Sequence, residues 1–275
     1  MGIIATQDLL DRAATQAGLD DFGELPFREA LDRLVDSASS EAKLSEGGTE
    51  RFAGSIIGYL VNRLKIVDYL KKHPELLDRP IEKPMFVFGL PRTGTTLTIN
   101  MLASDPARRN YMRWEALSSV PPSKSSGYKD DERYLAEQQR IDMSQKYMPH
   151  LSAIHHEDAD SPSEDQFAMA MSFCSQLFDS ILDVPSYHKW FLNEADYEPA
   201  FRIEDALMET FDLMIERQRA YRAKHGEDAI FDIDYAEQVR DPVGMMQKVY
   251  DHFDEPLTSE AEAAMRACIA ENPKG

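Results

Sequence analysis

The stretch that decides the fold is Pro84-Met-Phe-Val-Phe-Gly-Leu-Pro-Arg-Thr-Gly-Thr-Thr-Leu97. Its first part, residues 85–89, is a short apolar run without helical periodicity, which is typical of a buried parallel strand. The pattern over residues 97–102 predicts a helix. A strand, a glycine-containing turn and a helix in this order predict an α/β fold in which the turn meets the helix N-terminus.

The turn in this stretch has the chemistry of an anion site. Gly89 and Gly94 have the spacing of a Walker A loop. The first N–H groups of a helix lack internal partners, and the helix dipole adds positive charge there. Arg92 adds a forked cation, and Thr95 and Thr96 add hydroxyl donors. The turn is therefore predicted to bind a phosphate or a sulfate.

The residue at the Walker A lysine position bears on the class of reaction. A nucleotide triphosphatase needs that lysine on the β and γ phosphates, together with a hydroxyl and a carboxylate for Mg²⁺. This chain has Thr95 there, which favours a donor that is used without a metal. A P-loop nucleotide kinase or NTPase is the alternative hypothesis.

Composition limits the partners and the compartment. The 275 residues carry a net charge of −19, which excludes nucleic acid as a partner, but residues 84–113 hold four arginines and one aspartate. The distant Cys174 and Cys268 indicate a reducing compartment and no metal site. No apolar run of about 18 residues and no signal peptide occurs, so we expect a cytoplasmic protein without a transmembrane segment.

Helical patterns flank the decisive stretch. They predict a helical N-terminal extension over residues 1–80, with helices at 8–17, 26–39 and 49–72, the last capped by Thr49. Further helices are expected at 130–147, 161–182, 203–224, 241–253 and from 258 onward, and a second strand at 229–234. We expect a single domain over residues 1–275.

The stretch 84–97 resembles the 5′-phosphosulfate loop of sulfotransferases, most of all the bacterial branch related to the tyrosylprotein sulfotransferases. The resemblance continues through Trp114-Glu115 and residues 159–164, 231–235 and 241–242, and covers residues 50–275. It implies a P-loop-like three-layer fold with a central parallel sheet, in which residues 84–115 form the phosphosulfate loop unit.

The resemblance also implies a reaction. Sulfotransferases move the sulfuryl group of 3′-phosphoadenosine 5′-phosphosulfate (PAPS) to a hydroxyl or amine of a small-molecule, lipid or glycan acceptor, and release adenosine 3′,5′-bisphosphate (PAP). Matched by position, the residues that would hold the phosphosulfate are Pro91, Arg92, Thr93, Gly94, Thr95 and Thr96. Arg92 would also stabilise the charge that builds on the leaving oxygen.

Glu115 matches the position of the catalytic base in the tyrosylprotein branch, where a carboxylate takes the proton of the acceptor. An ion pair with Arg113 or Arg92 is the structural alternative for this glutamate. Other branches use a histidine as the base, which makes His155, beside His156, the competing candidate.

One expected part of the fold is missing from the sequence. Only 85–89 and 229–234 are convincing strands, whereas sheets usually have about four to six. The family's Arg and Ser that hold the donor 3′-phosphate have no counterpart. We therefore expect that two sheet strands and this motif are missing near residues 200–203. Either the segment belongs to the protein but not to this sequence, or it is truly deleted. A true deletion would favour a third hypothesis, a non-catalytic relative that binds anions.

Overall fold

The computed structural model describes residues 4–23, 26–76, 85–89, 93–123, 127–147, 158–195 and 226–271. The chain divides into two compact units. Unit 1 comprises Met1–Pro80, Arg113–Leu135 and Ser163–Leu207, and unit 2 comprises Ile81–Met112, Ala136–Pro162 and Met208–Gly275. Each unit has its own hydrophobic core, so each is described by itself.

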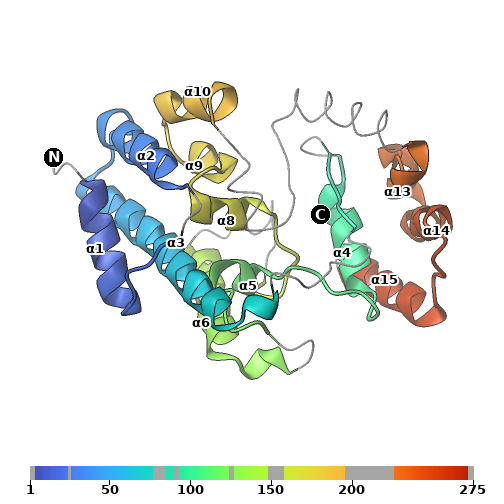
Figure 1. The fold of residues 1–275 in the computed structure, drawn as a ribbon. Coiled ribbons are helices and arrows are strands. Elements are labelled where there is room, and N and C mark those ends of the chain that lie inside the picture. The colour runs from blue at the N-terminus through green and yellow to red at the C-terminus, as the bar shows by residue number, and fades with distance from the viewer. Residues whose placement is uncertain are drawn as a thin grey trace. The chain divides into compact units, whose positions relative to one another are not determined.

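Unit 1 is built from helices. They are α1 (Thr6–Ala17), α2 (Arg28–Ser40), α3 (Glu46–Lys72), η1 (Pro74–Leu76), α5 (Arg113–Leu117), η2 (Tyr128–Asp130), α8 (Gln166–Met169), η3 (Ala170–Ser172), α9 (Gln176–Ile181) and α10 (Pro185–Asn193). α6 (Glu132–Tyr147) begins in unit 1 and continues into unit 2. In Figure 1, α1 lies along α3 and α10 lies beside α2. The helices expected near 8–17, 26–39 and 49–72 are thus formed, and they contribute buried residues to this core.

The start of α3 differs from the prediction. Thr49 was expected to cap this helix, but the helix begins at Glu46 and Thr49 lies in its first turn. Ser45 is the cap, because its backbone is extended and its hydroxyl accepts a hydrogen bond from the N–H of Gly48 at 3.1 Å. Gly47 and Gly48 suggest a break in the helical sequence pattern, but both lie in the first turn of α3, which Ser45 caps.

The single helix expected over 161–182 is wrong. The helical conformation ends at Phe173, which has φ of 58°, and a new helix, α9, starts after the cap residue Ser175. The fully buried Tyr187 satisfies the backbone at this break, since its hydroxyl accepts from the N–H of Ser175 and contacts the Phe173 carbonyl at 2.8 Å. A side chain distant in sequence therefore stabilises a break that local periodicity does not indicate.

Unit 2 contains the helix that follows the decisive turn. Its helices are α4 (Thr95–Ser104), η4 (Glu227–Ala229), α13 (Tyr235–Arg240), α14 (Pro242–His252) and α15 (Ser259–Glu271). α4 and α15 lie side by side (Figure 1) and bury Met101 and Met265 completely. The expected helix starts near 241 and 258 are confirmed: the Asp241 carboxylate accepts from the N–H of Gly244, and the Thr258 hydroxyl accepts from that of Ala261.

Neither expected strand is formed in the described residues. Residues 85–89 and 230–234 have no regular structure, η4 occupies 227–229, and the β-bridge seen pairs Met112 with Pro162. A parallel strand needs a neighbour for its backbone groups, and the described part of the chain offers neither segment a paired neighbour. The described residues are thus mostly helical, without the predicted central parallel sheet.

The burial pattern of the first segment nevertheless follows a strand. Met85 and Val87 pack against the core of unit 2, whereas Phe86 and Phe88 are 43% and 37% exposed. Side chains that alternate in this way belong to extended backbone with one covered face.

The helix expected at 203–224 and the missing segment near 200–203 fall outside the described residues, and the single-domain organisation stays a prediction.

Candidate functional site

The decisive turn enters α4 through Gly94. This glycine has φ of 88°, a left-handed conformation that side chains other than glycine rarely adopt. Its carbonyl oxygen accepts hydrogen bonds from the backbone N–H of Thr98 at 3.0 Å and from the Thr98 hydroxyl at 3.2 Å. The turn therefore ends on a fixed peptide group, immediately before the first helical residue, Thr95.

The two ends of the loop lie against each other. A Cβ atom added to Gly89 would lie 2.8 Å from the Thr93 hydroxyl oxygen and 3.1 Å from the Thr95 methyl carbon. A side chain at residue 89 would therefore require the Thr93 or Thr95 side chain to shift. The spacing of Gly89 and Gly94 in the sequence thus corresponds to a turn whose described ends, residues 89 and 93–95, lie in contact.

The start of α4 has the properties of an oxyanion site. Thr95 and Thr96 are its first two residues, and its first turn contains no acidic side chain. The N–H groups of a helix's first turn point outward without internal partners, and the dipole favours negative charge there. Pro91 and Arg92 lie outside the described residues, so their part in the site rests on the sequence.

α13 covers the other side of Gly94. A Cβ atom on Gly94 would lie 2.9 Å from the amide oxygen of Gln238 and 2.9 Å from a ring carbon of Tyr235. Gln238 is completely buried, whereas Tyr235 is 51% exposed. Sequence reasoning missed both residues, because no spacing connects them with the loop. The sequence carries no local signal for either residue, because the burial of Gln238 depends on how α13 packs.

Glu115 lies on α5 in unit 1. Its side chain is buried at 6% exposure, and the Ser123 hydroxyl donates a hydrogen bond to it. Asn62 on α3 holds the same helix: its amide nitrogen donates to the Ala116 carbonyl at 3.3 Å, and its amide oxygen accepts from the Ser119 N–H at 3.0 Å. The carboxylate is therefore fixed within unit 1, whereas the loop belongs to unit 2.

A second unusual carboxylate in unit 1 is Asp165. Burial, followed by the nearby charge of Glu164, raises its pKa from 3.8 to about 6. Its Oδ2 atom is buried without a hydrogen-bond partner among the described residues. In the sequence, this position is only part of the helix expected over 161–182. The competing base His155 and its neighbour His156 fall outside the described residues.

The raised pKa of Asp165 predicts a pH-dependent stability. Between pH 4 and 6 the folded protein holds a proton that the unfolded chain has lost, so this residue lowers the stability as the pH rises through that window. We expect Asp165→Asn to stabilise the protein at pH 7 by about 3 kcal/mol at most, since one pKa unit corresponds to about 1.4 kcal/mol. Urea unfolding at pH 4 and pH 7 measures this.

The comparison with wild type isolates Asp165 from the other carboxylates, which titrate in both proteins. Asp131 supplies the control, because hydrogen bonds from Arg133 lower its pKa. Asp131→Asn should therefore be less stable than wild type at pH 7, and this difference in the free energy of unfolding should shrink at pH 3. An equal pH dependence in Asp165→Asn and in wild type would contradict the prediction.

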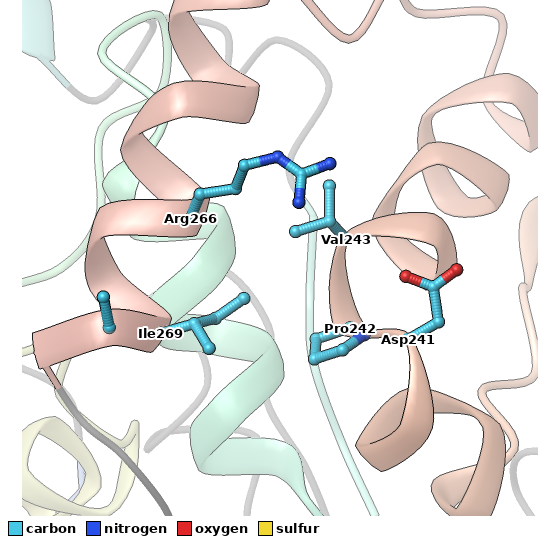
Figure 2. Close-up of a pocket in the computed structure, with 6 residues that line it drawn as sticks. Asp241, Pro242, Val243, Arg266 and Ile269 are labelled. Carbon is cyan, nitrogen blue, oxygen red and sulfur yellow. The ribbon is translucent and has the colours of Figure 1, made fainter.

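A pocket lies at α14 and α15, and no loop residue lines it. Figure 2 shows the apolar residues Pro242, Val243 and Ile269 of its lining together with the charged residues Arg266 and Asp241. Both charged groups already have partners: Arg266 pairs with Glu262 at 2.6 Å, and Asp241 accepts from the Gly244 N–H. An apolar pocket with its charges paired is no site for an oxyanion.

Among the described residues, no group of three or more His, Cys, Asp or Glu side chains is placed to hold a metal ion. None of the helices in the described ranges is long and apolar enough to cross a membrane.

Comparison with known proteins identifies the family. The model of the sulfotransferase family matches residues 84–196 and 192–259. Sulfotransferase STF9 from Mycobacterium avium is 26% identical with a TM-score of 0.82, over 98% of this chain and 88% of that chain. Sulfotransferase STF1 from Mycobacterium tuberculosis H37Rv is 25% identical with a TM-score of 0.82, over 96% and 93%. No curated protein matches the chain.

These similarities support the predicted fold class at the level of the family. The two mycobacterial structures imply the sulfotransferase α/β fold, although the described residues of this chain are mostly helical. The family match starts at residue 84, the first residue of the stretch 84–97, and it includes Glu115. This chain therefore belongs to the sulfotransferase family and is a sulfotransferase enzyme.

Proposed function

We propose that this enzyme takes its sulfuryl group from PAPS and transfers it, without a metal, to a hydroxyl or amine of a small-molecule, lipid or glycan acceptor in the cytoplasm. One observation carries the proposal. The loop closes tightly at Gly89 and delivers Gly94, at φ of 88°, to an α4 N-terminus without acidic residues. Such an end binds the oxyanion of a phosphosulfate without Mg²⁺.

The loop residues divide the work of holding the donor. PAPS supplies the sulfuryl group, and the N-terminal N–H groups of α4 with the hydroxyls of Thr93, Thr95 and Thr96 hold its phosphosulfate. Gly94 lets the backbone approach closely, and Pro91 restricts the preceding loop. Arg92 stabilises the negative charge that forms on the bridging oxygen as the bond to sulfur breaks.

Glu115 is the proposed base. Its carboxylate takes the proton of the acceptor hydroxyl or amine while that group attacks sulfur. The hydrogen bond from Ser123 orients the carboxylate, and the Asn62 contacts hold α5 in place. Burial of the carboxylate limits competition from water. The kinship with the tyrosylprotein branch remains a prediction, as does His155 as the alternative base.

The part of the site for the 3′-phosphate is proposed to be incomplete. The family model matches in two pieces that meet at residues 192–196, next to the segment near 200–203 where the sequence lacks strands and the phosphate-binding motif. An enzyme without this motif keeps the contacts to the phosphosulfate and loses those that distinguish PAP from 5′-AMP.

Titration calorimetry with PAP, 5′-AMP and ATP, each with and without Mg²⁺, tests the proposal. We expect PAP to bind without Mg²⁺ and to bind more weakly to Arg92→Ala. The affinity for PAP should exceed the affinity for 5′-AMP by less than about tenfold, which corresponds to about 1.4 kcal/mol. Radiolabelled PAPS with a panel of phenols, amines and glycans then identifies the acceptor. ATP turnover that requires Mg²⁺ would instead support the kinase hypothesis, and no PAP binding would support a non-catalytic relative.

A further inference from the structure

The loop helix contains a chain of hydrogen bonds between buried residues. The Gln238 amide nitrogen on α13 donates to the Thr98 hydroxyl, which donates to the Gly94 carbonyl oxygen at 3.2 Å. Gln238 is 0% exposed and Thr98 is 3% exposed, so water does not compete for these bonds. The chain connects α13 with the peptide group that precedes α4.

The direction of this peptide group matters for the anion site. A trans peptide is planar, so the Gly94 carbonyl and the Thr95 N–H point in opposite directions. The carbonyl points into α4, where Thr98 binds it through both its N–H and its hydroxyl. The Thr95 N–H must therefore point out of the helix end, toward the place of an oxyanion.

Packing alone does not account for a glutamine at residue 238. Its amide oxygen is buried without a hydrogen-bond partner among the described residues, and it lies against Gly94. Burying an unpaired amide oxygen is unfavourable, and an apolar side chain of similar length would avoid the cost. The other half of the amide, which holds Thr98, is the feature that an apolar residue cannot supply.

The helix that carries Gln238 is itself held in place. The Asp234 side chain caps α13 by accepting from the N–H of Glu237 at 2.8 Å. Lys248 on α14 pairs with the Glu237 carboxylate. Gln238 thus acts from a fixed position rather than from a free loop.

We infer that Thr98 and Gln238 are positioning residues that aim the Thr95 N–H at the donor's phosphosulfate. They touch neither donor nor acceptor and act through the Gly94–Thr95 peptide. The inference rests on the proposed PAPS function for its effect on binding, but not for the hydrogen bonds themselves.

The experiment uses isosteric variants of the full chain. Thr98→Val removes the two hydrogen bonds of the hydroxyl and keeps the bond from the Thr98 backbone N–H to the Gly94 carbonyl. Gln238→Met removes only the bond to the Thr98 hydroxyl. Both variants keep the size of the side chain, and each should lower PAP affinity about tenfold in calorimetry. The double variant should lose no more than either single variant, because both changes break one chain. Thr98→Ser keeps a hydroxyl and should retain wild-type affinity.

Thr15→Val is the matched control. The Thr15 hydroxyl makes the same kind of bond, to the carbonyl of Asp11 four residues earlier at 2.8 Å, on an exposed face of α1. This variant should leave PAP affinity unchanged. Thermal unfolding of all variants identifies any loss of affinity that comes from loss of fold, and Thr98→Ser and Gln238→Met remain informative if Thr98→Val unfolds.

The ligand-free protein separates this inference from the proposed function. The carbonyl-carbon NMR resonance of Gly94 should move in Thr98→Val and in Gln238→Met, whether or not PAP binds. An unchanged resonance, or folded variants with wild-type PAP affinity, would overturn the inference. Wild-type protein that fails to bind PAP would overturn the proposed donor, while the Gly94 resonance would still decide the hydrogen-bond chain.

Discussion

Gly94→Ala is expected to lower PAP affinity at least about thirtyfold. The left-handed backbone at φ of 88° costs a non-glycine residue about 1–2 kcal/mol. The new methyl group would also lie 2.9 Å from both Gln238 and Tyr235, and such overpacking costs about 1–3 kcal/mol more. To escape the backbone strain and the clash, the chain must move the peptide group that starts α4. The substitution should therefore weaken donor binding. Calorimetry with PAP measures it.

Two glycines in unit 1 separate the causes. Gly127 has φ of 78° with no atom within 4 Å of an added Cβ, so Gly127→Ala imposes the backbone strain without the clash. Gly58 lies within α3, also with open space, so Gly58→Ala imposes neither. Both controls should bind PAP as wild type does. A Gly94→Ala protein with unchanged affinity would show that the loop tolerates a side chain there and does not need this closure.

Glu115→Gln is expected to lower the rate of sulfuryl transfer by about 10²–10⁴ and to leave PAP affinity unchanged, since general-base catalysis contributes about that factor. The amide keeps the size of the side chain and can still accept from Ser123, so the fold of α5 should persist. Single-turnover kinetics with PAPS and an identified acceptor measures the chemical step apart from binding.

Glu137 provides a matched control for Glu115→Gln. It is also a buried glutamate, at 8% exposure, and it pairs with Arg140 at 2.6 Å. Glu137→Gln should affect stability but not the rate of transfer. Full activity in Glu115→Gln would exclude this glutamate as the base, and His155→Ala would then test the competing histidine.

The turn before α4 was predictable from sequence, because its geometry depends on local backbone chemistry, whereas its role as a binding site stays a prediction. The spacing of Gly89 and Gly94 indicated the closed turn, and the first residues of α4 follow from it. Glu115 entered only through a resemblance, because nothing local distinguishes it from other glutamates. Gln238 could not be predicted, since its role depends on α13 packing against a loop that precedes it by more than a hundred residues in the chain.

The sequence by itself determined most helices of this sulfotransferase and the glycine turn before α4, because apolar periodicity, caps and glycine positions act over a few neighbouring residues. Only the tertiary structure decided the break at Phe173, which Tyr187 stabilises, and the cover over Gly94. It also decided the strands: residues 85–89 have a strand's alternation but no paired neighbour among the described residues. A helix satisfies its backbone within itself, whereas a strand requires a partner from elsewhere in the chain.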